Sequence, residues 1–232
     1  MTEFHIDVRG GAWEPTNPPL TPETLFPRDP RRAYRVVDDF ESELAYYTGA
    51  PYAVAVDSCT NALYLALVYE QRWGGCRDIG LPKRTYVGVL QAARNARHTV
   101  IWYANPEDPW QECGWYHIAN TEVIDSARHL KQAMYWPKTL TALSFHAAKQ
   151  LPLGRGGAIL TDDPAAAEWL RAARMDGRPP GAPIEATQFP GFHCPMPPDT
   201  AARGLWILSR WVDAGYDPPP LPPETYPDLS LL

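Results

Sequence analysis

The chain has 232 residues, of which 45% are hydrophobic, and it carries a net charge of −6. This length and composition indicate one ordered domain with a sizeable core, and no apolar run is long enough to cross a bilayer. The first residues lack the basic and apolar regions of a secretory signal, and the four widely spaced cysteines form no Cys-x-x-Cys pair. We therefore expect a cytoplasmic protein with reduced thiols, no metal site and no membrane partner.

Residues 1–33 are rich in proline and predict an irregular N-terminal arm. From residue 34 to residue 212, helical and strand patterns alternate. We expect helices near 35–48, 60–73, 87–96, 164–174 and 200–211, and strands near 53–56, 79–81, 99–103, 121–124, 140–145 and 157–161. This alternation predicts a three-layer α/β domain in which a mostly parallel sheet is flanked by helices. Residues 213–232 are again Pro-rich, a composition that favours an extended tail.

A small polar turn precedes the second expected helix. The apolar run Val54–Val56 indicates a buried strand, and Asp57–Asn61 then opens the helix that follows. The first amides of a helix have no intrahelical acceptor, and the helix dipole adds positive potential there. Ser58, Cys59 and Thr60 are therefore candidate ligands of a phosphate group, although an ordinary capping turn has the same composition.

Two later strands end near residues that carry acid–base chemistry. The apolar run that ends at Asp125 places a carboxylate where α/β sheets present functional groups. Ser144 ends the next strand, and Lys149 follows it before the glycine-rich turn Gly154–Gly157. A lysine amine can form a Schiff base with a carbonyl cofactor, and a carboxylate can pair with a protonated ring nitrogen. Taken alone, Lys149 fits a surface lysine better than a catalytic one, and Asp125 fits a helix N-cap as well as a functional carboxylate.

In this chain order, a phosphate turn, a strand-end aspartate and a lysine resemble pyridoxal 5′-phosphate enzymes of fold type I, and above all the DegT-type sugar aminotransferases. The segment 58–63 is similar to the family's Ser-Gly-Thr-x-Ala-Leu turn, and 125–127 to its Asp-Ala-Ala. Residues 144–157 resemble its Ser-Phe-x-x-x-Lys followed by Gly-Glu-Gly-Gly. Its opening helix and its Pro-x-x-Thr-aromatic segment are matched by 40–50 and 82–86. Five ordered motifs between about residues 40 and 211 make the resemblance specific.

The resemblance implies pyridoxal 5′-phosphate as the cofactor, bound by the large domain of that fold. Lys149 would form the Schiff base and move the proton on the reacting carbon, while Asp125 would keep the pyridine nitrogen protonated. Tyr86 would stack on the ring. The phosphate would be held by Ser58, Cys59, Thr60 and Ser144. The family builds its active sites at a dimer interface, so the resemblance also implies a homodimer with shared sites.

Several positions depart from the family pattern. Arg128 stands where the family has Gln or His, and Arg155 replaces the glutamate of Gly-Glu-Gly-Gly, so both are candidate substrate-binding residues. His193 lies where the family's Gly-x-Asn-x-Arg would reach the neighbouring subunit's phosphate, which makes it a candidate ligand of the partner's cofactor. Family members continue into a smaller C-terminal domain, most of which this chain does not match. We therefore expect a truncated member whose active site is open on one side.

Three functions remain open at this point. The leading hypothesis is an aminotransferase acting on a bulky, phosphate-bearing substrate. The second is an α-decarboxylase of an amino acid attached to a larger molecule, such as a hypermodified base in phage-type DNA, with Arg128 holding the carboxylate. The third is an inactive binding module with the same fold. Residues 71–178 carry 14 Lys and Arg against 10 Asp and Glu, which would suit a nucleotide-linked substrate or DNA, but no nucleic-acid motif supports DNA.

Overall fold

The computed structural model describes residues 30–103 and 113–232, so most of the expected arm 1–33 lies outside the described residues. The helices are α2 (Pro30–Thr48), α3 (Cys59–Tyr69), α4 (Val87–Asn95), α6 (Pro164–Ala173) and α7 (Pro198–Ala214), with a π turn η1 (Glu70–Gly74) and a 3-10 turn η2 (Ile184–Ala186). The strands are β1 (Tyr52–Val56), β2 (Asp78–Pro82), β3 (Thr99–Tyr103), β4 (Tyr116–His117), β5 (Val123–Asp125), β6 (Leu140–Ser144) and β7 (Gly157–Thr161). No helix in the described part of the chain is long and apolar enough to span a membrane.

The strands form a five-stranded sheet in the order β1-β7-β6-β5-β4 and a two-stranded sheet of β2 and β3. Two backbone hydrogen bonds between Gly80 of β2 and Ala119, just after β4, connect the two sheets. The α/β class is therefore confirmed.

The expectation of a mostly parallel sheet is wrong, because the sheet is mixed. The pairs β5–β6 and β2–β3 are parallel, whereas β1–β7, β6–β7 and β4–β5 are antiparallel. Only residues 118–122 join β4 to β5. Parallel neighbours need a crossover of about a dozen residues, so this short connection allows only a hairpin.

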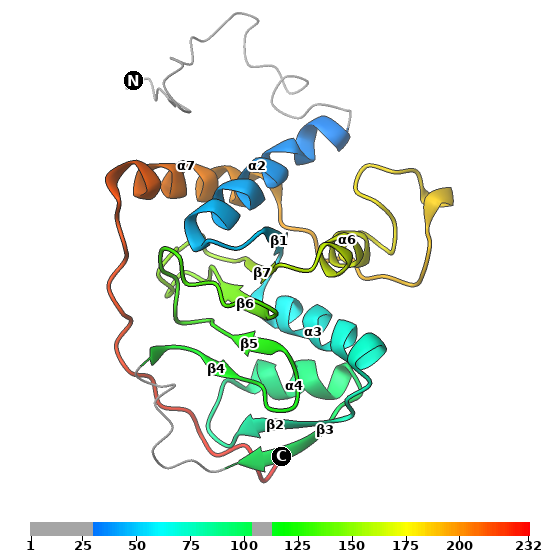
Figure 1. Cartoon of the computed structure of the whole chain (residues 1–232), viewed down its shortest axis with the longest axis vertical. Coiled ribbons are helices and arrows are strands. Elements are labelled where there is room, and N and C mark those ends of the chain that lie inside the picture. Colours follow the sequence, from blue (N-terminus) through cyan, green and yellow to red (C-terminus); the bar gives the residue numbers. More distant parts are fainter. Residues whose placement is uncertain (1–29, 104–112) are drawn as a thin grey trace, which may run out of the picture.

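The two faces of the sheet bury separate cores. Along β1, Val54 and Val56 pack with residues of α3, α4 and α6, whereas Ala53 and Ala55 pack with residues of α2 and α7. Figure 1 shows α2 and α7 together on one side of the strands and α3 and α4 on the other. An added Cβ at Gly204 of α7 would lie 2.5 Å from the ring of Phe40, so α2 and α7 can approach this closely only with glycine there. The chain thus forms the three expected layers.

A buried ion cluster ties the outer helix α2 to the edge of the sheet. The carboxylate of Glu41 accepts a hydrogen bond of 2.8 Å from the backbone nitrogen of Ala55. It also pairs with Arg171 at 3.2 Å and with the buried guanidinium of Arg174, which follows α6. Because Glu41 and Arg174 are both buried while Arg171 stays partly exposed, the cluster is stable only when the two buried charges keep each other as partners.

Residues 215–232, which follow α7, take an extended path. Helix α7 ends at Gly215, which adopts the left-handed conformation typical of a helix C-terminus. From there the chain runs along one side of the molecule, past the central strands, to β2 and β3 (Figure 1). The backbone nitrogen of the buried Leu229 donates a hydrogen bond of 2.8 Å to the carbonyl of Lys83. Residues 215–232 therefore pass the carboxyl ends of β5 and β6 on their way from α7 to β2.

Candidate active site

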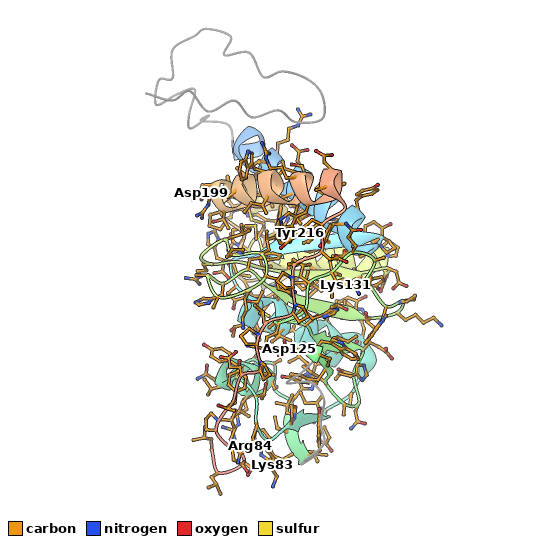
Figure 2. All side chains as sticks on the ribbon, turned by 90° about the vertical axis from the view of Figure 1, so that its left-hand side faces the viewer. Lys83, Arg84, Asp125, Lys131, Asp199 and Tyr216 are labelled. Atoms are coloured by element: carbon orange, nitrogen blue, oxygen red, sulfur yellow. The ribbon has the colours of Figure 1, made fainter. Side chains whose placement is uncertain are left out.

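A cavity of about 810 Å³ lies at the carboxyl ends of β5 and β6, beside the N-termini of α3 and α4. Nine of the ten site residues predicted from the sequence line it: Ser58, Cys59, Thr60, Tyr86, Asp125, Arg128, Ser144, Lys149 and Arg155. Residues Leu221–Glu224 and Tyr226 of the Pro-rich tail line it as well. Figure 2 looks onto this side and shows the tail passing Asp125 on its way from Tyr216 to Lys83 and Arg84. The site is therefore more enclosed than the sequence predicted.

The N-terminus of α3 forms an anion-binding cradle at one end of the cavity. Ser58 is the N-cap, and its hydroxyl oxygen accepts a hydrogen bond from the backbone nitrogen of Asn61. The backbone amides of Cys59 and Thr60 lie in the first turn of α3, where an amide has no carbonyl four residues earlier in the helix to bond to, so they can donate to an outside ligand. An added Cβ at Gly157 of β7 would lie 2.5 Å from the backbone nitrogen of Cys59. A glycine at this position lets the sheet approach the cradle closely.

The thiol of Cys59 lies where the cradle meets the acid–base residues. Burial raises its pKa well above the usual value, Asp125 raises it further, and the charge of Lys149 opposes the shift. The thiol is therefore protonated at neutral pH. It forms a neutral wall of the cavity and is not an activated nucleophile.

Asp125 ends β5 with its carboxylate buried and facing the cavity. Burial raises its pKa above the usual value, while hydrogen bonds from the backbone nitrogen of Ala127 and from the hydroxyl of Tyr116 oppose the shift, together with the charge of Lys149. Tyr116 lies directly opposite Asp125 in the β4–β5 hairpin, and its hydroxyl is 2.8 Å from that of Thr85. Sequence reasoning missed Tyr116, because β4 has two residues and shows no strand pattern.

The raised pKa of Asp125 predicts a pH-dependent effect of Asp125→Asn. The folded protein binds a proton at Asp125 more tightly than the unfolded chain does, so this side chain contributes most below its unfolded pKa, and the contribution is lost as the pH rises through the folded pKa. Asn cannot ionise, so Asp125→Asn removes the loss of stability that ionisation of Asp125 causes at higher pH. We expect the variant to be more stable than the wild type at pH 7 and equally stable near pH 3, as measured by urea unfolding. The exposed Asp39→Asn is the control, and a variant less stable at pH 7 would contradict the prediction.

Lys149 follows β6 in a tight turn. Its backbone nitrogen donates a hydrogen bond of 2.9 Å to the carbonyl of His146, and Gly154 accepts one from Ala147, so the chain turns back into β7. The side chain of Lys149 is partly exposed and lines the cavity. Its charge lowers the pKa of both Asp125 and Cys59. The amine therefore lies within electrostatic reach of the two groups beside the cradle.

The two arginines that depart from the family pattern already have protein partners. The guanidinium of Arg155 is exposed and bonds to the carboxylate of Asp57 at 3.0 Å and to its backbone oxygen at 3.2 Å. Arg128 pairs with Glu224 and donates a hydrogen bond to the carbonyl of Pro222. Both arginines line the cavity, and a substrate would meet them as ion pairs rather than as free cations.

Tyr86 and His193 occupy exposed positions. Tyr86 is 56% exposed at the N-cap of α4, and its ring meets the edge of Tyr226 at a centroid distance of 6.5 Å. It is therefore a surface aromatic and not part of the core. The imidazole Nδ1 of His193 lies 3.2 Å from the carboxylate of Asp176, and His193 does not line the cavity in the described chain. Its expected reach into a second subunit stays a prediction.

The layered sheet with a helix N-terminus, an aspartate and a lysine around one cavity defines an α/β protein built like the aminotransferases. The chain belongs to the DegT/DnrJ/EryC1/StrS aminotransferase family, whose model matches residues 28–109 and 137–212. It is 27% identical to the spore coat polysaccharide biosynthesis protein SpsC of Bacillus subtilis (strain 168), over 76% of this chain and 57% of that protein.

Solved structures of similar fold include DesV of S. venezuelae in complex with a ketimine intermediate, at 22% identity and a TM-score of 0.60, covering 77% of this chain and 57% of that one. NtdA of Bacillus subtilis with bound cofactor PMP has 16% identity and a TM-score of 0.62, covering 81% of this chain and 53% of that one.

The similarity is limited in two respects. The chain spans between half and three-fifths of the length of these relatives. The family model also leaves residues 110–136 unmatched, and these include Tyr116, Asp125 and Arg128. The match therefore covers the cradle and the Lys149 turn, whereas the role of Asp125 depends on its motif and on its position in the cavity.

Proposed function

We propose that this chain is the cofactor-binding part of an aminotransferase that uses pyridoxal 5′-phosphate and acts on a sugar-like, bulky substrate. The observation that carries the proposal is the meeting of Lys149, Asp125 and the N-terminus of α3 in one cavity. Membership of the aminotransferase family supports the reaction class. The naming of SpsC for polysaccharide biosynthesis supports the substrate class. A phosphate on the substrate is a further part of the proposal, for which the cavity volume of about 810 Å³ leaves room.

The residues present fit this cofactor. The backbone amides of Cys59 and Thr60 at the N-terminus of α3 suit a phosphate, and Gly157 lets β7 pass close beside them without a side chain in the way. At the other end, the buried Asp125 suits a cationic ring nitrogen, because opposite charges attract strongly in a site with little water. Ser144 and Thr60, which carry hydroxyl groups, line the same cavity.

Each residue has a separate role in the proposed reaction. When bound, pyridoxal phosphate withdraws electrons from the carbon that carries the reacting nitrogen. Lys149 would attach the cofactor through Nζ and then move the proton on that carbon. Asp125 would hold a proton on the ring nitrogen, and Tyr116 and the backbone nitrogen of Ala127 keep its carboxylate in one orientation. Tyr86 would cover the ring face from α4.

A second copy of the chain is the partner that we propose. The exposed side chain of His193 would then approach the cradle of the other subunit, and residues of each subunit would complete the other's cavity. Light scattering of the purified chain tests this directly. We expect the mass of a dimer, and a monomer at all concentrations would exclude the shared site.

The experiment that tests the reaction uses the chain with added pyridoxal phosphate and L-glutamate as amino donor. Conversion of the cofactor to pyridoxamine phosphate, followed by absorption and mass spectrometry, is the expected result. Release of CO₂ with the aldehyde form retained would instead identify a decarboxylase. A chain that binds no cofactor at all would have to be an inactive binding module.

A further inference from the structure

The Pro-rich tail is fastened on both sides of the cavity. Before the cavity, the carboxylate of Asp217 accepts hydrogen bonds from the hydroxyl of Tyr47 at 3.0 Å and from the backbone nitrogen of Gln132 at 2.7 Å. Beyond the cavity, Arg84 donates to the carbonyl of Tyr226 at 3.1 Å, and Leu229 is bonded to Lys83. Residues 221–224 between these anchors line the cavity, where the tail passes Asp125 (Figure 2). The middle of the tail is therefore held in place over the site.

The contact at the middle of the tail is an ion pair between Glu224 and Arg128. The side chain of Arg128 is 9% exposed and that of Glu224 is 45% exposed. The guanidinium also donates to the carbonyl of Pro222, while its buried Nε has no hydrogen-bond partner in the described chain. Burial and a hydrogen bond to Glu224 raise the pKa of Tyr226, which places that hydroxyl beside the same carboxylate. Among the residues that the structure describes, the groups that bond to the Arg128 guanidinium thus come from the tail.

A buried guanidinium requires an anion, but nothing requires that this anion be Glu224. The planar fork of arginine binds any carboxylate with similar geometry. Glu224 is half exposed and carried on a segment without helix or strand, so water can reach it and compete for it. The other arginine at the cavity, Arg155, is engaged by Asp57 close to the cradle. Arg128 is therefore the cation that a carboxylate entering beside the tail would meet.

We propose that Arg128 is a carboxylate-binding site occupied by Glu224 of the same chain, and that the carboxylate of an incoming amino donor displaces Glu224 and releases residues 221–226 from the cavity mouth. The tail then acts as a strap that closes the empty pocket and opens when the donor binds. This inference rests on the proposed function, because it assigns the donor of that reaction its binding group. A tail that permanently lined the cavity would keep Glu224 on Arg128, whereas the strap requires the donor carboxylate to replace Glu224 there.

The first test measures hydrogen exchange of the tail by mass spectrometry on the full chain with added pyridoxal phosphate. Glu224→Gln removes the charge that binds Arg128 and keeps the side-chain size. We expect exchange at the amide of Leu229, which is hydrogen-bonded to Lys83, to rise at least about fivefold, because a tail that is no longer held at Arg128 opens this bond more often. Glu168→Gln, an exposed glutamate on α6, is the matched control and should change nothing there. Unchanged exchange in Glu224→Gln would overturn the strap.

The second test measures succinate binding by calorimetry, since succinate has carboxylates but no amine to react with the cofactor. Glu224→Gln should bind succinate about tenfold more tightly than the wild type, because the intramolecular competitor is gone. Saturating succinate should also raise tail exchange in the wild type. In the double variant Arg128→Gln and Glu224→Gln, which leaves no unpaired buried charge, binding should be lost. Equal affinity in the wild type and Glu224→Gln, or binding that survives loss of Arg128, would refute the proposal.

Absorption of bound pyridoxal phosphate separates this proposal from the proposed function. A Lys149-dependent absorption band with no effect of Glu224→Gln would leave the enzyme proposal intact and reject the strap. Tail release by succinate without that band would support the carboxylate site and reject the cofactor.

Discussion

Lys149→Ala is expected to abolish covalent retention of added pyridoxal phosphate. Lys149 is the lysine that lines the cavity with Asp125 and the α3 cradle, so after borohydride reduction the wild type should gain the mass of one cofactor on the peptide that contains it. The variant should gain none. Loss of the acid–base group should also reduce transamination by at least about 10²- to 10⁴-fold. Mass spectrometry of the reduced peptides and a spectrophotometric assay measure the two effects.

The control is Lys131→Ala, which removes an exposed lysine that does not line the cavity. It should keep both the adduct and the activity. If the Lys149→Ala variant formed the adduct on another lysine at the wild-type yield, covalent attachment of the cofactor would not depend on Lys149. Unchanged melting of the variant would establish that its fold is intact, since the partly exposed side chain makes little contact with the core.

Glu41→Gln is expected to cause the largest loss of stability. The substitution keeps the size of the side chain but leaves the buried Arg174 without its counter-charge and weakens the bond to Arg171. Breaking one side of a buried ion pair costs about 3–5 kcal/mol, because a charge then stays in the interior uncompensated. Urea unfolding should show a free energy of unfolding lower by that amount.

Asp39→Asn is the matched control, because Asp39 is exposed on the same helix. It should change the free energy of unfolding by less than about 0.5 kcal/mol, as most surface substitutions do. The double variant Glu41→Met and Arg174→Met should lose less than Glu41→Gln, because no buried charge is left unpaired. A loss below about 1 kcal/mol in Glu41→Gln would mean that water still reaches the cluster.

Local patterns predicted most of the elements. The polar turn at Ser58 and the apolar residues after it marked α3, and apolar runs marked β1, β6 and β7. These signals are local, because capping and alternation depend on residues within a few positions of one another. Strand direction was not predicted correctly, since direction depends on how far the connecting chain must travel. The hairpin of β4 and β5 is joined by five residues and therefore runs antiparallel.

The residues of the candidate site were predicted from motifs that lie apart in the sequence. Ser58, Asp125 and Lys149 are far apart in the chain, and only the order of their motifs suggested that they meet. Tyr116 could not be recognised, because its only signal is its position opposite Asp125 in the hairpin. A tyrosine placed by a two-residue strand carries no pattern of its own.

The sequence by itself determined the family, the α/β class and nine residues that line the cavity, because each is encoded in a short motif. Only the tertiary structure decided what surrounds them. Glu224 is 96 residues from Arg128, and a Pro-rich segment has neither helical nor strand periodicity from which a partner could be predicted. Its path over the cavity depends on anchors at Asp217 and Leu229 that form only once the sheet has brought Gln132 and Lys83 into place.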